Sequence, residues 1–508
     1  MKAYSYHTFI LPFIWEKSAS DTGYLLENQY GDWQKKYRNS PDWEELYIRK
    51  DDGKISLAGE ISIEDFYKEY KYFHPHICEA IYGTLSNETG NLSSQSIVTN
   101  FSLRPGGKPL SGSYRIRCGD REYVLDVYAI ELRIYNTGAG LYVIKCRNTL
   151  KNQFDLNSVK DINDYGRRIT LPVMNNPVCA DELELDLKDL GAFAENWSVI
   201  KSRAAEMRFD TLSYISNIVT GPMGVADTDI SLGIDDRMFV LSWTTDAEKT
   251  IQFTEKKEDE REYPFIADEK LSKDFYELAA VDSAGTCSCD SYEMRKELLG
   301  KYVYFRWIDS GSIYTVAAQA FNALSSAEDD GPVSFLPENF ITQYYQMSCL
   351  CLAQRTSLIN FSRKAEKISK GIERRKDTIN RRQIQEMMDL QERYIAFLTQ
   401  IDSTEASPEE QGIELYGMLR ERLNIETEKA TLQEQLTGLS DLADASQSFS
   451  FSKLGHTVAV AAFVLSLGQL ITDCITEHDS FALEVSLVLV ALVIVVAGFV
   501  WARIGRRN

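Results

Sequence analysis

Two apolar runs near the C-terminus constrain this chain of 508 residues more than any other feature. They span His456–Ile475 and Val485–Ala502, and each approaches the roughly 20 residues that a helix needs to cross a hydrocarbon core. Lysine and arginine near membrane helices are retained on the cytoplasmic side. Because Lys453 precedes the first run and the basic tail 503–508 follows the second, the sequence predicts a membrane hairpin with both chain ends in the cytoplasm.

Polar residues recur along one face of the first apolar run. Spacings of three or four residues place four of them on that face: Ser466, Gln469, Asp473 and Thr476. A polar stripe in hydrocarbon is costly unless it faces protein or water. We therefore expect an oligomer whose pore these residues line, with Asp473 and Glu477 forming acidic rings at the external mouth. A polar face used only for helix packing is the alternative.

The chain before the apolar runs is predicted to hold a mixed domain and then long helices. Arg121–Tyr135 is rich in β-branched and aromatic residues, and Asn136–Gly138 supplies turn chemistry, so a hairpin with Leu141–Cys146 is expected. Further strands are predicted at Met238–Trp243 and Tyr302–Trp307. From about Glu338 onward, apolar residues recur at helical spacing.

The predicted fold class is therefore an α+β cytoplasmic domain followed by long helices and a C-terminal two-helix transmembrane hairpin. Its expected parts are a ligand-sensing domain, a long-helix stalk, two membrane helices and a basic tail, at 1–335, 336–453, 454–502 and 503–508. A long cytoplasmic helix that continues into a membrane helix is suited to transmit movement.

Composition and motifs narrow the functions that we consider. The net charge of −20 removes a general attraction to phosphate backbones, so direct nucleic-acid binding is not expected. Walker, nucleophile-elbow, zinc-protease and dinucleotide motifs are absent, which predicts no enzyme and no catalytic residue. His74, His76, Cys78 and Glu79 form the one ligand-rich patch, and no second cluster completes a metal site. No metal-ligating residue and no required cofactor is predicted, and a divalent cation stays open as a bound ion.

The layout of the chain resembles the CorA-like divalent cation transporters. That resemblance implies a homo-oligomer, typically a pentamer, whose first membrane helix lines the pore. The family carries a Gly-Met-Asn triplet at the outer end of that helix, and here Leu470–Cys474 reads Leu-Ile-Thr-Asp-Cys instead. A transporter of divalent cations is thus one alternative function, and a membrane-anchored enzyme, such as a messenger-degrading one, is another.

Several short segments resemble a narrower branch, the CorA-like membrane effectors encoded beside type III CRISPR systems. They are His7–Trp15, Tyr135–Gly138, Ile162–Arg168, Asp235–Val240 and Phe340–Ser362. The resemblance implies a multi-pass protein of the bacterial inner membrane that acts in antiviral defence. In this branch a nucleotide messenger, a conjugate of S-adenosylmethionine and AMP, binds the cytoplasmic domain, and the membrane part then impairs the infected cell. The implied partners are further copies of the chain, the messenger and the lipid bilayer.

Residues within these segments are suited to bind such a ligand. Arg167 and Arg168 can hold a phosphate bidentately, and Asp235 or Asp236 can meet a ribose hydroxyl or a sulfonium charge. Aromatic rings can stack on adenine, with Trp307 as a further candidate. The alternative is structural, because arginines also pair with local acids and aromatic side chains are usually core. The predicted ligand-binding residues are Phe13, Trp15, Asn136, Thr137, Tyr165, Arg167, Arg168, Asp235, Asp236 and Arg237.

Overall fold

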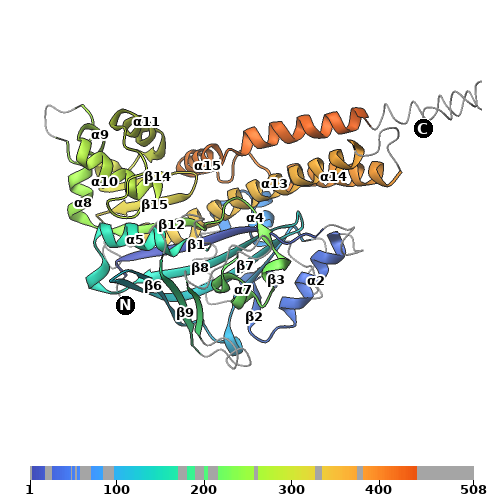
Figure 1. The fold of residues 1–508 in the computed structure, drawn as a ribbon, viewed down its shortest axis with the longest axis horizontal. Coiled ribbons are helices and arrows are strands. Elements are labelled where there is room, and N and C mark those ends of the chain that lie inside the picture. The colour runs from blue at the N-terminus through green and yellow to red at the C-terminus, as the bar shows by residue number, and fades with distance from the viewer. Residues whose placement is uncertain are drawn as a thin grey trace, which may run out of the picture. The chain divides into compact units, whose positions relative to one another are not determined.

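The chain divides into two units in the computed structural model. Figure 1 labels their helices and strands. One unit comprises 1–361 and 393–430, and the other comprises 362–392 and 431–508. The described residues are 3–17, 26–46, 48–51, 54–57, 70–83, 96–169, 180–188, 199–203, 215–256, 261–326, 335–373 and 381–442.

The first unit is built around one mixed β-sheet. Strand β1 (Ser5–Ile14) lies near its centre and pairs antiparallel with β8 (Ala139–Asn148) and β12 (Phe239–Thr245). The strand order is β10-β9-β6-β7-β8-β1-β12-β15-β14-β13, with β11 on β1, and with β5 joining β2 to β7. The other strands of this sheet are β2 (Trp43–Leu46), β5 (Val98–Leu103), β6 (Gly112–Cys118), β7 (Arg121–Tyr135), β9 (Glu182–Leu187), β10 (Val199–Arg203), β11 (Ser231–Leu232), β13 (Val303–Tyr304), β14 (Ser312–Val316) and β15 (Ala320–Ser325).

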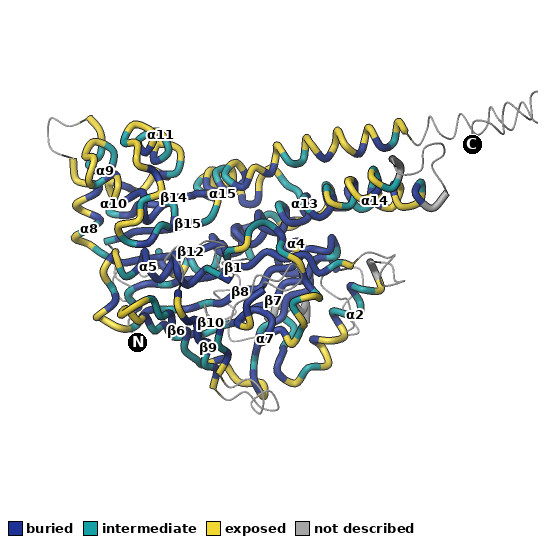
Figure 2. The backbone as a smooth tube through the Cα atoms, viewed as in Figure 1, coloured by how far each residue is buried: buried dark blue, intermediate teal, exposed yellow. Residues whose placement is uncertain are grey.

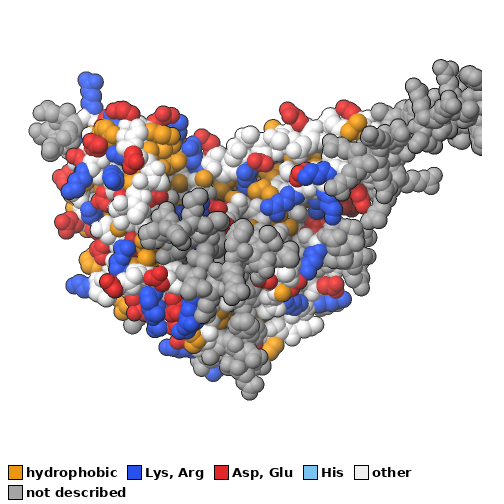
Figure 3. Space-filling model, viewed as in Figure 1, with side chains coloured by type: hydrophobic (Ala, Val, Ile, Leu, Met, Phe, Trp, Pro, Cys, Tyr) orange, Lys and Arg blue, Asp and Glu red, His pale blue; other side chains and the backbone are white. Residues whose placement is uncertain are grey.

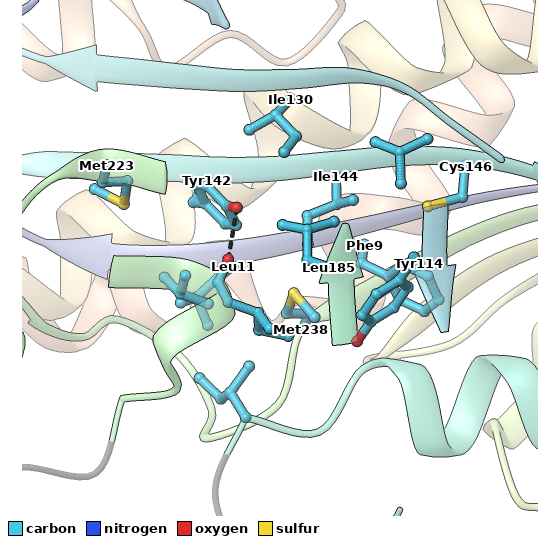
Figure 4. Packing of buried hydrophobic residues seen from close by; sticks show 14 of the residues in the cluster. Phe9, Leu11, Tyr114, Ile130, Tyr142, Ile144, Cys146, Leu185, Met223 and Met238 are labelled. Carbon is cyan, nitrogen blue, oxygen red and sulfur yellow. Dashed lines mark hydrogen bonds between the residues drawn. The ribbon is translucent and has the colours of Figure 1, made fainter. Parts of the chain in front are cut away.

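One face of the sheet carries the larger hydrophobic core (Figure 4). Because side chains alternate along a strand, Phe9, Leu11 and Phe13 of β1 share this face. They lie beside Tyr142 and Ile144 of β8, and the Tyr142 hydroxyl donates to the carbonyl of Ile218 at 2.7 Å. Helices that contribute to this core are α2 (Leu26–Arg38), α5 (Leu156–Gly166) and α7 (Asn217–Met223). Figure 2 shows the central strands buried along most of their length.

A second core lies where helices surround the parallel pair β12 and β15. Phe253, Phe265 and Phe275 pack together there, with ring centroids 4.7 to 5.1 Å apart for the closer contacts. Side chains of Asp246 and Asp268 accept backbone N–H groups at the starts of two of these helices, which explains where they begin. The helices are α8 (Ala247–Thr254), α9 (Pro264–Ala267), α10 (Glu269–Ala280) and α11 (Tyr292–Tyr302).

Helix α13 (Tyr345–Glu373) makes polar contacts with the sheet. The Tyr345 hydroxyl donates to Glu131 of β7 at 2.5 Å, and the Ser357 and Thr137 hydroxyls lie 2.7 Å apart. The remaining elements are a two-stranded sheet and short or helical segments: β3 (Ile48–Asp51), β4 (Lys54–Leu57), α4 (Pro75–Tyr82), η1 (Pro105–Gly107), η2 (Lys151–Gln153), η3 (Asp227–Asp229), η4 (Ile308–Ser310), α12 (Phe335–Asn339), η5 (Phe340–Tyr344), α14 (Arg381–Gln400) and α15 (Glu410–Arg422).

The second unit is helical where it is described. It contains the end of α13 from residue 362, the start of α14 up to 392, and residues 431–442. Apolar side chains such as Ile368, Leu390 and Leu436 are buried at helical spacing among charged neighbours.

The predicted hairpin of Arg121–Tyr135 with Leu141–Cys146 is confirmed by the pairing of β7 and β8. The predicted strand at Met238–Trp243 is confirmed as β12, whereas Tyr302–Trp307 forms only the two-residue strand β13. Two successive long helices, α13 and α14, follow the mixed region as expected.

The predicted fold class, an α+β cytoplasmic domain on long helices with a transmembrane hairpin, is wrong. The structure is organised by a large mixed sheet with helices, and no helix among the described residues combines the length and the apolar character needed to cross a bilayer. The apolar runs lie outside the described residues, as do the pore-lining candidates Ser466, Gln469, Asp473, Thr476 and Glu477.

Candidate anion-binding site

The predicted aromatic residues of β1 are enclosed in the core. Phe13 is fully buried and lies against Gly140 of β8, where a Cβ atom would meet the ring at 2.4 Å. The Trp15 indole donates from Nε1 to the carbonyl of Ala139 at 2.8 Å and stacks on Tyr30 at 5.9 Å between centroids. Both rings therefore pack against other residues of the protein core. Trp307, by contrast, is 40% exposed.

The predicted residues of the β7–β8 turn contact the helix that follows the mixed region. Asn136 donates its backbone N–H to the carbonyl of Ile97 at 2.9 Å. Thr137 lies beside Ser357, and its carbonyl accepts from Asn360 Nδ2 at 2.9 Å. The turn thus anchors α13 to the sheet.

The arginines come together because two distant segments pair. Helix α5 ends at Gly166, where a Cβ atom would lie 2.8 Å from the Phe9 ring, so the helix approaches β1 closely. The chain then turns at Arg167, whose carbonyl accepts from the Met238 N–H at 2.8 Å, and Arg168 forms a β-bridge with Arg237. This pairing brings two predicted ligand-binding segments, Arg167–Arg168 and Asp235–Arg237, side by side.

Arg167 is the most enclosed member of the cluster. Its Nη1 donates to Gln319 Oε1 at 2.5 Å and its Nη2 to the carbonyl of Val281 at 3.2 Å, while Asp164 lies 3.6 Å away. The Nε–H is buried and has no hydrogen-bond partner among the described residues. Burial lowers the pKa of Arg167 to about 10, and the charges of Arg237 and Arg168 act in the same direction. The side chain is still a cation at neutral pH.

Arg168 is partly exposed and has one firm partner. Its Nη2 donates to Asp164 Oδ1 at 2.8 Å, and its side chain is 16% exposed. Its Nε–H is also buried without a partner in the described part of the chain. Arg167 and Arg168 therefore each have one buried N–H donor that is not paired with an acceptor among the described residues.

Arg237 lies against carboxylates at the open side of the cluster. Its Nε and Nη2 donate to Asp235 Oδ2 at 3.1 and 3.0 Å, and Asp236 Oδ1 lies 3.6 Å from Nε. Burial and the hydrogen bond with Asp236 raise the pKa of Asp235, while Arg237 opposes the rise. The cluster therefore combines hydrogen-bond donors for an anion with carboxylates that can accept from hydroxyl groups.

Tyr165 lies elsewhere on α5. Its hydroxyl accepts from Arg121 Nη2 at 3.4 Å, and the Arg121 guanidinium lies 5.8 Å from the ring centroid. Burial raises the pKa of the Tyr165 phenol. The Tyr165 side chain thus contacts Arg121 of β7, next to the arginine cluster.

Sequence reasoning missed three members of the site. Asp164 binds both arginines, and its spacing of three and four residues from them was a usable signal. Gln319 and the carbonyl of Val281 reach Arg167 from segments far away in the chain, for which no local pattern exists.

The ligand-rich patch near α4 shows no metal geometry. The rings of His74 and His76 stack at 5.7 Å, and the Cys78 thiol contacts the carbonyl of Tyr70. Among the described residues, no group of three or more His, Cys, Asp or Glu side chains is arranged to hold a metal ion.

On the face shown in Figure 3, basic and acidic side chains are interspersed over the described residues. No family model matches the chain, and no curated protein or solved structure is significantly similar to it.

Proposed function

We propose that this protein senses a small phosphorylated ligand, and that Arg167, Arg168 and Arg237 bind the phosphate. The observation that supports this most strongly is that the Nε–H groups of Arg167 and Arg168 are buried and find no hydrogen-bond acceptor in the part of the chain that the structure describes. A buried donor without an acceptor costs about 1–3 kcal/mol, and phosphate oxygens supply acceptors with matching charge. Ligand binding would thereby remove a cost that the free protein carries.

The mixed charges of the site favour a nucleotide over inorganic phosphate. Asp235 and Asp236 adjoin Arg237, so a ligand that carries both a phosphate and hydroxyl or cationic groups meets complementary partners. A conjugate of S-adenosylmethionine and AMP has all three kinds of group. With the sequence resemblance described above, this supports a ligand-triggered effector of antiviral defence that performs no catalysis itself.

Calorimetry on the purified full-length protein tests the ligand. The panel is the S-adenosylmethionine–AMP conjugate, AMP, S-adenosylmethionine and inorganic phosphate. We expect the conjugate to bind most tightly and AMP to bind more tightly than S-adenosylmethionine, because the phosphate is the anchoring group. Absence of heat with all four compounds would overturn the proposal.

A matched pair of variants tests the site. Arg168→Gln removes one cationic partner, and we expect about 10- to 100-fold weaker binding, which corresponds to a charged hydrogen bond. Arg104→Gln is the control, because Arg104 is also 16% exposed and pairs with one carboxylate, Glu44, at 3.2 Å. Equal affinities for the two variants would show that the ligand binds elsewhere.

A further inference from the structure

Arg133, another arginine with buried donors that lack partners among the described residues, lies beside Tyr345 of helix α13. Arg133 of β7 has a side chain only 5% exposed, and its one ionic contact within the described ranges is long, 3.4 Å from Nη2 to Glu131 Oε2. Its Nε and Nη1 are buried without hydrogen-bond partners among the described residues. The Tyr345 ring lies 4.9 Å from the guanidinium, which compensates the charge only partly.

The carboxylate nearest to Arg133 is already engaged. Glu131 accepts from Lys145 Nζ at 2.5 Å and from the Tyr345 hydroxyl at 2.5 Å. Lys145 and Arg133 thus bring two positive charges to one negative charge. A buried charge without a full partner is costly, so this group of side chains favours a further anion.

Unused oxygen atoms lie on the same face of the sheet. Asn100 of β5 is the cross-strand partner of Arg133, and its Nδ2 donates to the carbonyl of Ile81 at 2.9 Å. This bond fixes the amide and leaves Asn100 Oδ1 buried without a donor among the described residues. The Tyr135 hydroxyl, two residues further along β7, is also buried and makes no hydrogen bond of good geometry with the described residues, although Arg133 acts on it both through its charge and as a nearby donor.

We propose that Arg133, Asn100 and Tyr135 form a buried site for a small oxyanion that carries its own hydroxyl proton, of the class of hydrogen phosphate or bicarbonate. Such an ion accepts from the arginine and donates to Asn100 Oδ1, while the tyrosine hydroxyl can do either. Chloride and sulfate only accept, so they would leave Asn100 unsatisfied. The site is separate from the Arg167 cluster and does not depend on it.

Thermal unfolding of the full-length protein tests this site with inorganic anions. The probes are hydrogen phosphate, sulfate and chloride at equal ionic strength and neutral pH. We expect phosphate to raise the midpoint about 2–4 °C above that in sulfate, because a bound ion stabilises the folded state. Equal midpoints in all three anions would mean that water fills the site, and would overturn the proposal.

Variants assign the effect to its residues. Arg133→Met replaces the buried charge with a side chain of similar length, and Tyr135→Phe removes only the hydroxyl, so at least one is expected to fold. We expect the phosphate-specific rise to vanish in Arg133→Met and to fall in Tyr135→Phe, while Arg168→Gln keeps it. A rise that persists in both variants of the buried site, or that disappears in Arg168→Gln, contradicts the assignment.

Discussion

Arg167 donates a hydrogen bond to the carbonyl oxygen of Val281, a buried valine whose backbone is left-handed, with a φ of 60°. This conformation costs a β-branched residue on the order of 1–2 kcal/mol. Val281 is the residue that ends α10, and its N–H donates to the carbonyl of Leu278. This hydrogen bond thus links the candidate site to the strained C-terminal end of α10.

A comparison of Val281→Gly with Val281→Ala tests for that backbone strain. Val281→Ala loses buried surface but keeps a Cβ, whereas Val281→Gly loses slightly more surface and relieves the left-handed backbone. We expect Val281→Gly to be at least as stable as Val281→Ala in urea unfolding. At Val240, a buried residue of β12, the order should reverse, with glycine less stable by about 1 kcal/mol. The same order at both positions would contradict the strain.

His7 predicts a loss of stability in mild acid. Burial lowers the pKa of this fully buried imidazole to about 4, although the hydrogen bond to Asn163 opposes the shift. The unfolded chain binds a proton near pH 6.5 and the folded chain does not, so stability falls as the pH drops from about 6.5 to 4. Between pH 7 and 5 we expect a loss of about 2 kcal/mol in the free energy of unfolding, which His7→Gln should abolish. A parallel loss in both proteins would point to another group.

Two tyrosines provide a matched test of buried hydrogen bonding. Tyr345→Phe removes a hydrogen-bond donor from Glu131. Burial raises the pKa of Glu131, but Lys145 and Arg133 outweigh this effect and lower the pKa to about 2, so the carboxylate stays charged. We expect a loss of about 1.5–3 kcal/mol in the free energy of unfolding. In phosphate-free buffer, Tyr135→Phe should change it by less than about 0.5 kcal/mol, because that hydroxyl makes no hydrogen bond of good geometry with the described residues. Similar losses for both variants would exclude this explanation.

Thr137→Val separates anchoring from ligand binding. The variant removes the contact with Ser357 and should lower the free energy of unfolding by about 1 kcal/mol. We expect its affinity for the conjugate to match that of the wild type, since the turn contacts α13. Weaker binding at unchanged stability would place Thr137 in the ligand site instead.

Local patterns in the sequence predicted local structure well. The β-branched and aromatic density of Arg121–Tyr135 with the turn at Asn136–Gly138 was sufficient for the β7–β8 hairpin. The position of β1 near the centre of the sheet depends on pairing with β8 and β12, which lie far along the chain and leave no local signal. The membrane hairpin was inferred from apolar length alone, and the fold class built on it is wrong.

Only part of the candidate site was predicted from the sequence, because local patterns do not show which distant segments meet. The arginines and aspartates of Arg167–Arg168 and Asp235–Arg237 do meet, through the bridge between Arg168 and Arg237. The sequence did not distinguish a buried Phe13 from an exposed ring that stacks on a ligand, because aromatic side chains occur both in cores and in binding sites. Its burial is decided by the alternation of β1 and by the close approach of Gly140.

The most direct test is the affinity of the S-adenosylmethionine–AMP conjugate for a double variant of the exposed arginines. Arg168→Gln with Arg237→Gln removes two of the three cations while leaving the buried Arg167 in place. We predict binding weakened more than about 100-fold, whereas a control pair, Arg104→Gln with Arg38→Gln, stays within about twofold of the wild type, because these two arginines pair with Glu44 and Glu45 away from the cluster. Wild-type affinity in the Arg168 and Arg237 double variant would contradict the account.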